Sequence, residues 1–168
     1  MRSIQRREEI MKLLKASNSA IKGMELANRF DVTRQIIVKD IAILRAAGNS
    51  IIATPDGYIY NVSNNKVKSI VAVNHNTNET INELETVVKY GGIIEDVIIE
   101  HPLYGEIRGN LMIKNLNDLN KFEHEFINKN IKPLSNLTNG VHLHTISTDT
   151  EDDMKSIKME LKEKGFLL

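Results

Sequence analysis

The sequence contains no cysteine among its 168 residues. This absence excludes disulfide frameworks and thiolate metal sites, and it fits the reducing cytosol. No apolar run approaches the length of a membrane-spanning helix, and the first residues lack the apolar segment of a secretory signal. We therefore expect a soluble cytoplasmic protein without a membrane partner.

The chain also lacks an overall excess of either charge, with 22 basic and 22 acidic side chains. This balance hides an asymmetry, because residues 1–65 hold ten Lys and Arg against six Asp and Glu, whereas residues 66–168 hold twelve against sixteen. A basic part joined to an acidic part indicates a DNA- or membrane-facing module attached to a second domain.

The basic part of the chain predicts three helices followed by a β-hairpin. Amphipathic patterns mark the helices, at residues 4–15, 24–30 and 34–47. Two short apolar runs flank Pro55-Asp56-Gly57, a strong turn signal between strands. This order is the winged helix-turn-helix layout, so we assign residues 1–61 to a DNA-binding domain.

The third helix carries the residues predicted to read DNA. Thr33 is a good N-cap, and Arg34, Gln35 and Lys39 project away from the apolar face of the helix. Arg pairs with guanine edges and Gln with adenine edges, while Lys suits phosphate. We therefore predict DNA contacts from these four residues.

This region resembles the N-terminal winged helix of biotin-ligase-type and related repressors. The resemblance rests on Glu25-Leu26-Ala27, on the run from Phe30 to Gln35 and on the run from Leu44 to Gly48. One departure is the hairpin tip, Thr54-Pro55-Asp56, which has no Lys or Arg for the usual phosphate contact. The alternative is a small protein-interaction domain with an exposed helix.

The acidic part predicts alternating strands and helices. The strands are predicted at residues 69–73, 93–99, 107–113 and 141–146, and the helices at 80–90, 116–128 and 151–164. This βαββαβ order predicts a ferredoxin-like split βαβ regulatory domain at residues 69–168 and an α+β fold class for the chain. The polar residues 62–68 are predicted to be a linker.

This topology brings histidines together. The first and second strands run parallel and the fourth lies antiparallel beside the first, so His75, His101 and His142 gather at one edge of the sheet. His142 and His144 are two residues apart and leave the same face of their strand, and Glu83 lies on the first helix of the domain. Imidazoles and a carboxylate from separate elements suit a first-row transition metal.

Other interpretations of the histidines stay open. His142 and His144 also fit two polar residues on a solvated sheet face. His101 is a candidate to support a metal ligand or to contact an effector. His124 lies in a charged helical segment, and we assign it to the surface.

Residues 70–147 resemble the three-histidine (3H) domain. The resemblance rests on His75 followed by Glu83, on the run from His101 to Ile107, and on residues 133–146. Together with the winged helix, the whole chain is similar to niacin-responsive repressors. Such repressors bind operators of NAD-biosynthesis and niacin-uptake genes when nicotinic acid is present.

The resemblance implies a ligand set and a partner. It implies a divalent transition metal (zinc, nickel, iron or manganese) at His75, Glu83, His142 and His144. It also implies a homodimer formed through the second domain and nicotinic acid as the corepressor. Candidate effector contacts are His101, Tyr104 and Arg108.

Two rival functions stay open from the sequence. The first is a regulator that senses the metal itself. The second is an enzyme fused to a DNA reader, either a biotin-ligase-like protein, whose Gly-rich and Arg-rich nucleotide loop is missing, or a hydrolase in which the His-x-His pair and a Glu activate water. We prefer the repressor and predict no catalytic residue.

Overall fold

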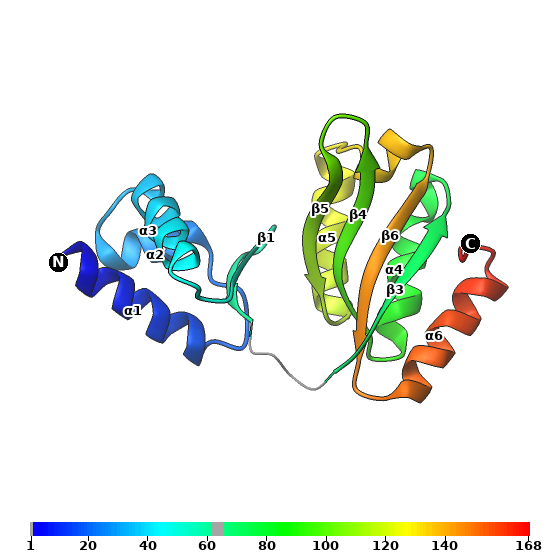
Figure 1. The fold of residues 1–168 in the computed structure, drawn as a ribbon, viewed down its shortest axis with the longest axis horizontal. Helices are drawn as coiled ribbons and strands as arrows, with labels where there is room; N and C mark the ends of the chain where they lie inside the picture. Colours follow the sequence, from blue (N-terminus) through cyan, green and yellow to red (C-terminus); the bar gives the residue numbers. More distant parts are fainter. Residues whose placement is uncertain (1, 62–65) are drawn as a thin grey trace. The chain divides into compact units, whose positions relative to one another are not determined.

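The computed structural model describes residues 2–61 and 66–168 of the chain. The chain divides into two compact units, Met1–Asn64 and Asn65–Leu168 (Figure 1). Residues 62–65, which belong to the predicted linker, lie outside the described residues, whereas Val67 and Lys68 already form the start of a strand. No helix in the described ranges is long and apolar enough to cross a bilayer.

The described part of the first unit holds three helices and a two-stranded antiparallel sheet. Its elements are α1 (Ser3–Ala16), α2 (Gly23–Phe30), α3 (Arg34–Ala46), β1 (Ile51–Thr54) and β2 (Gly57–Tyr60). Aliphatic side chains from the helices form its core, among them Ile10, Leu14, Leu26, Ile37, Ile41 and Leu44. The predicted order of three helices and a hairpin is confirmed.

Neighbouring residues define both ends of α3. Thr33 is the N-cap as predicted, and its Oγ1 accepts a hydrogen bond from the backbone N–H of Ile36 at 3.4 Å. Asp31, with a φ of 51°, forms the left-handed turn that separates α2 from α3. Gly48, with a φ of +87°, follows the last turn of α3 and ends the helix.

The second unit is a four-stranded antiparallel sheet with helices on one face (Figure 1). Its strands are β3 (Val67–Asn74), β4 (Ile93–His101), β5 (Gly105–Ile113) and β6 (Val141–Thr148), and its helices are α4 (Thr80–Lys89), α5 (Leu116–Asn128) and α6 (Glu151–Glu163). Apolar side chains of the strands and of all three helices share one core. Two short 3-10 turns, η1 (Thr77–Glu79) and η2 (Leu134–Thr138), were not predicted.

The βαββαβ order and the α+β class are confirmed, but the predicted ferredoxin-like arrangement of the strands is wrong. The sheet runs β3-β6-β4-β5, so the fourth strand of the domain separates the first and second. In a ferredoxin-like sheet the third strand takes that place. The reason lies in burial: β4 has buried residues at Ile94, Asp96, Ile98 and Ile99, whereas β5 is exposed or half-buried except at Ile113. The apolar strand of this hairpin therefore lies inside the sheet and the polar strand at its edge.

Candidate metal centre and nucleic-acid interface

Glu83 is the most deeply buried charged side chain among the described residues, with 0% of its surface exposed. It lies in the first turn of α4, where the helix dipole favours a negative charge. Its Oε1 has no hydrogen-bond partner within the described parts of the chain. A buried carboxylate is costly unless positive charge compensates it.

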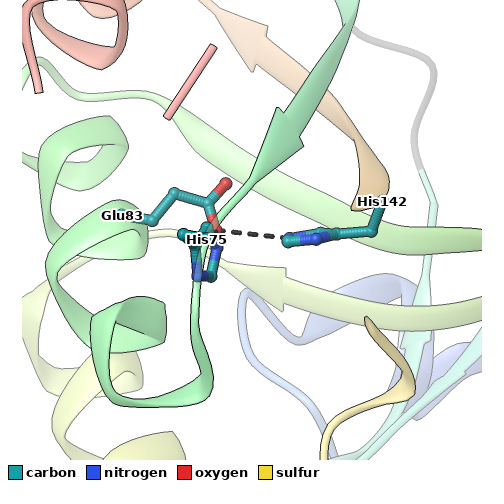
Figure 2. Close-up of side chains that lie close together, drawn as sticks. All are labelled: His75, Glu83 and His142. Carbon is teal, nitrogen blue, oxygen red and sulfur yellow. Dashed lines mark hydrogen bonds and ion pairs between the residues drawn. The ribbon is translucent and has the colours of Figure 1, made fainter. Parts of the chain in front are cut away.

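Three imidazoles surround this carboxylate. Nε2 of His75 lies 2.6 Å from Oε2 of Glu83, and Nε2 of His142 lies 3.4 Å from the same oxygen. Nε2 of His144 lies 3.3 Å from Oε1. Figure 2 shows His75 and His142 directed toward Glu83. The structure therefore brings together the four side chains that the sequence singled out.

The register of the sheet explains this convergence. β3 and β6 are antiparallel with Val73 opposite His142 and Val71 opposite His144, so both histidines face α4 together with the apolar side of β3. His75 follows the last residue of β3 at the same end of the sheet. Alternation along β6 therefore presents two imidazoles to one carboxylate.

Each of these histidines has a backbone carbonyl at its other ring nitrogen. Nδ1 of His75 and Nδ1 of His142 each lie 2.8 Å from a carbonyl oxygen, and Nδ1 of His144 lies next to the carbonyl of Asp96. A carbonyl only accepts hydrogen bonds, so Nδ1 carries the proton and Nε2 of a neutral ring presents its lone pair. Three lone pairs facing a carboxylate fit a bound cation, and a backbone carbonyl at the second nitrogen is typical of metal-ligating histidine.

The protonation equilibria show the same demand for positive charge. Burial by itself would raise the pKa of the Glu83 carboxyl, but His144, His142 and His75 hold that pKa well below its ordinary value. Burial would lower the pKa of His75 and of His144, but interaction with Glu83 outweighs it and raises both pKa values. The carboxylate stays charged, and a proton or a metal ion compensates it.

The ligand atoms of His75, Glu83 and His142 all lie within 4.8 Å of one another, which is close enough for one metal ion. His144 is outside this group of three, although its Nε2 approaches the other oxygen of the same carboxylate. Nitrogen and oxygen donors without sulfur suit a first-row divalent ion. The residues present therefore fit a metal centre.

The three candidate effector residues lie outside this cluster. His101 ends β4, and its ring packs on the ring of Tyr104 with centroids 5.1 Å apart. Nδ1 of His101 accepts a hydrogen bond from the backbone N–H of Leu103, which turns the ring onto the β4–β5 connection. Arg108 pairs with the carboxylates of Asp96 and Glu106. Thus His101 reaches the expected end of the sheet but faces another way.

Sequence reasoning missed a cavity of about 340 Å³ next to His75. Its lining residues are Asn74, His75, Asn76, Glu79, Asn82, Lys164, Gly165 and Phe166. The segment after α6 forms one wall of this open cavity, because the N–H of Asn74 donates a hydrogen bond to the carbonyl of Phe166 at 2.9 Å and the rings of His75 and Phe166 meet edge to face. This short terminal pairing has no recognisable pattern in the sequence.

The predicted DNA-reading residues lie at the exposed start of α3. Thr33, Arg34, Gln35 and Lys39 are all exposed. Arg34 leans over the start of α2, since its Nε lies 3.6 Å from the position that a Cβ on Gly23 would take. The helix therefore presents polar and basic side chains opposite its buried face, as a recognition helix does.

Sequence reasoning did not single out the apolar side chains on the exposed part of α3. Ile36, Val38 and Ile43 are all exposed there. The signal was present, because none of the three belongs to the buried stripe of the helix. Apolar side chains on a recognition helix suit the methyl group of thymine.

Comparisons with known proteins match both units of the chain. Residues 6–59 match the family model of an HTH domain, and residues 68–168 match that of the 3H domain. The "Probable transcription repressor NiaR" of Thermotoga maritima is 43% identical over 164 residues, which cover 98% of this chain and 94% of the relative. The "Transcription repressor NadR" of Bacillus subtilis is 35% identical over 167 residues, which cover 97% and 93%.

These similarities extend over both units of the chain. The two relatives are named as transcription repressors, so they support a regulator and not the enzyme alternatives. The resemblance to the 3H domain and the prediction of an HTH domain are both confirmed. The chain belongs to the family of NiaR- and NadR-type transcription repressors, and it carries an HTH domain followed by a 3H domain.

Proposed function

We propose that this repressor controls NAD-biosynthesis and niacin-uptake genes with nicotinic acid as its corepressor and a divalent metal in its second unit. One observation carries most of the proposal: three imidazoles face the buried Glu83 carboxylate through Nε2, while each Nδ1 faces a backbone carbonyl. Such an arrangement is suited to a cation. Because its target is operator DNA, the protein acts in the cytoplasm.

The metal ligands in this proposal are His75, Glu83, His142 and His144. Zinc, nickel, iron and manganese all accept imidazole and carboxylate ligands, and the chain has no cysteine to favour zinc. When bound, the ion supplies a fixed positive charge that attracts a carboxylate or a ring nitrogen. The protein residues keep this charge in a buried position next to the cavity at His75.

Nicotinate is a small aromatic carboxylate, and the cavity beside His75 offers both chemistries it needs. The Lys164 ammonium is a cation in its wall, and the Phe166 ring is an apolar surface. His101, Tyr104 and Arg108 are the weaker candidates for effector contact, because none of them interacts with the His–Glu cluster in the contacts described above.

DNA binding requires two copies of the first unit in this proposal. Thr33, Arg34, Gln35 and Lys39 contact one half-site, and a homodimer formed through the second units presents two recognition helices about 34 Å apart. An effector shifts such an equilibrium only through its different affinities for the two arrangements. Nicotinate therefore represses by binding more tightly to the dimer whose helices match the operator.

Calorimetric titration of the full chain with nicotinate, before and after chelation, tests this function. We expect binding heat with metal present and none after the metal is removed. Operator affinity, measured by fluorescence anisotropy, should then rise with nicotinate only in the metal-loaded protein. Nicotinate that binds equally well to chelated protein would contradict the role of the metal.

The same titration separates the repressor from a metal sensor. In a metal sensor, adding metal without nicotinate changes operator affinity by itself. If metal alone gives the full increase in affinity, nicotinic acid is not the effector and the metal-sensing alternative holds.

A further inference from the structure

Asp96 lies at an irregularity of β4. Between the pairs Ile94–Ile146 and Ile98–Leu143, β4 has one residue more than β6, which is the pattern of a β-bulge. A bulge releases backbone groups from the ladder and turns them toward other partners. Here the carbonyl of Asp96 lies next to Nδ1 of His144 and accepts its hydrogen bond.

The side chain of Asp96 holds this bulge in place. Asp96 is buried, with only 3% of the residue exposed. Oδ1 accepts a hydrogen bond from the backbone N–H of Thr145 at 2.8 Å, and Thr145 adjoins His144. Oδ2 pairs with Arg108, which reaches it from β5. One carboxylate therefore connects three neighbouring strands beside a histidine of the cluster.

We propose that Asp96 is a positioning residue for the metal centre and that Arg108, on the outer strand β5, holds the Asp96 carboxylate in place. The orientation of the His144 ring depends on the carbonyl of Asp96, and that carbonyl depends on the bonds of the Asp96 carboxylate to Thr145 and Arg108. Arg108 is partly exposed, so the position of an accessible side chain is transmitted to a buried ligand. This inference rests on the proposed metal centre, since it assigns a residue that orients one of its ligands.

Two contacts of Asp96, with the N–H of Thr145 and with Nδ1 of His144, show that it does more than join β4 to β5. A salt bridge that only joined β4 to β5 would not need the N–H of Thr145, which lies on the third strand. A regular β4 would direct the Asp96 carbonyl into the ladder and leave Nδ1 of the buried His144 without that acceptor. Removing a residue that orients a metal-bound histidine typically weakens metal binding about 10- to 100-fold.

The test uses full-length protein and Co²⁺ as the probe, because its visible spectrum reports ligand geometry. We expect Asp96→Ala to weaken Co²⁺ binding about 10- to 100-fold and to change the band positions or intensities of the bound ion. Arg108→Ala should act in the same direction, and Arg108→Lys should restore part of the affinity because it retains a cation. Glu106→Gln is the matched control: it removes the other carboxylate partner of Arg108 without touching Asp96, and should change affinity by no more than about twofold.

The outcomes separate the inference from the function on which it rests. Circular dichroism of the metal-free variants shows whether each is folded. If Asp96→Ala does not fold, the Co²⁺ affinities of Arg108→Ala and Arg108→Lys test the inference instead. Folded variants with the affinity and spectrum of the parent protein would overturn the positioning role while leaving the metal centre intact. A parent protein that binds no Co²⁺ would overturn the metal centre and this inference with it.

Discussion

Among single residues, Glu83 determines the character of the second unit. It is a fully buried carboxylate whose neighbours are three imidazoles, and no other described residue supplies compensating charge at such short distance. Its replacement by a neutral isostere therefore tests the metal centre with little change in volume.

Glu83→Gln should weaken binding of a divalent metal by at least about 100-fold, because an amide supplies no negative charge to a cation in a buried site. The affinity is measured by competition with a chromogenic chelator. Glu85→Gln is a suitable control, since Glu85 is exposed on the same helix. If the two variants bind metal with equal affinity, Glu83 is not a metal ligand.

The pKa shifts at this site predict how the metal and pH act together. The pKa values of His75 and His144 are raised, so their pairing with Glu83 stabilises the metal-free protein at lower pH. This stabilisation is lost as the pH rises through those pKa values. The pKa of Glu83 is lowered, so its contribution is lost only well below the ordinary carboxyl range. Metal binding instead requires deprotonated rings and becomes stronger as pH rises.

We therefore expect the increase in Tm on metal addition to grow between about pH 6 and pH 8. Differential scanning fluorimetry of chelated and metal-loaded protein over a pH series measures it. The Glu83→Gln variant should show no such trend. An increase in Tm that is the same at every pH would mean that metal and protons do not compete for these rings.

At the scale of elements, α3 is held by a buried ion pair to α1. The Asp40 carboxylate is bonded by Nε of Arg6 at 2.6 Å and by Nη1 of Arg7 at 3.2 Å. Both Asp40 and Arg6 are buried, so this contact fixes α3 against α1. The opposite face of α3, with Arg34, Gln35 and Lys39, is exposed.

Asp40→Ala should destabilise the first unit by about 3 kcal/mol, because it leaves the buried Arg6 guanidinium without its partner. Hydrogen exchange of the full chain measures the effect locally: amides of α1 and α3 should exchange faster, and those of β4 and β6 should not change. Glu9→Gln removes only an exposed ion pair of α1 and should cost about 0.5 kcal/mol or less. Unchanged exchange in α3 would show that the apolar core alone positions this helix.

The exposed side of α3 makes a separate prediction about DNA. Gln35→Ala should lower affinity for the operator by about 1–3 kcal/mol with little effect on unrelated duplexes, because it removes contacts to a base edge. Lys39→Ala should weaken binding to both DNAs and reduce the salt slope by about one. Fluorescence anisotropy at several salt concentrations measures both effects. Equal losses for Gln35→Ala on both DNAs would argue against base reading.

For the whole molecule, the proposal requires that the first units of two copies of the chain bind DNA together. Half-sites about one helical turn apart place both recognition helices on one side of the duplex. Inserting about five base pairs, half a turn, between the half-sites of a selected operator should therefore remove the nicotinate-dependent gain in affinity, whereas inserting about ten should restore part of it. If the spacing has no effect, each chain binds DNA independently.

The sequence by itself determined the order and the ends of most elements. Both ends of α5 coincide with the prediction, and Thr33 and Gly48 define α3 as expected. Caps, turns and hydrophobic periodicity depend on residues that are close along the chain, so they can be recognised without knowing the fold. The pairing of His142 and His144 on one strand face follows from the same local alternation.

Only the tertiary structure decided how distant segments meet. It placed β6 between β3 and β4, turned His101 away from the cluster, brought the end of the chain to His75 and gave the carbonyl of Asp96 to His144. These features depend on which strand is buried deepest and on backbone groups released by a bulge. Such choices come from contacts between residues far apart in the chain, and no local pattern records them.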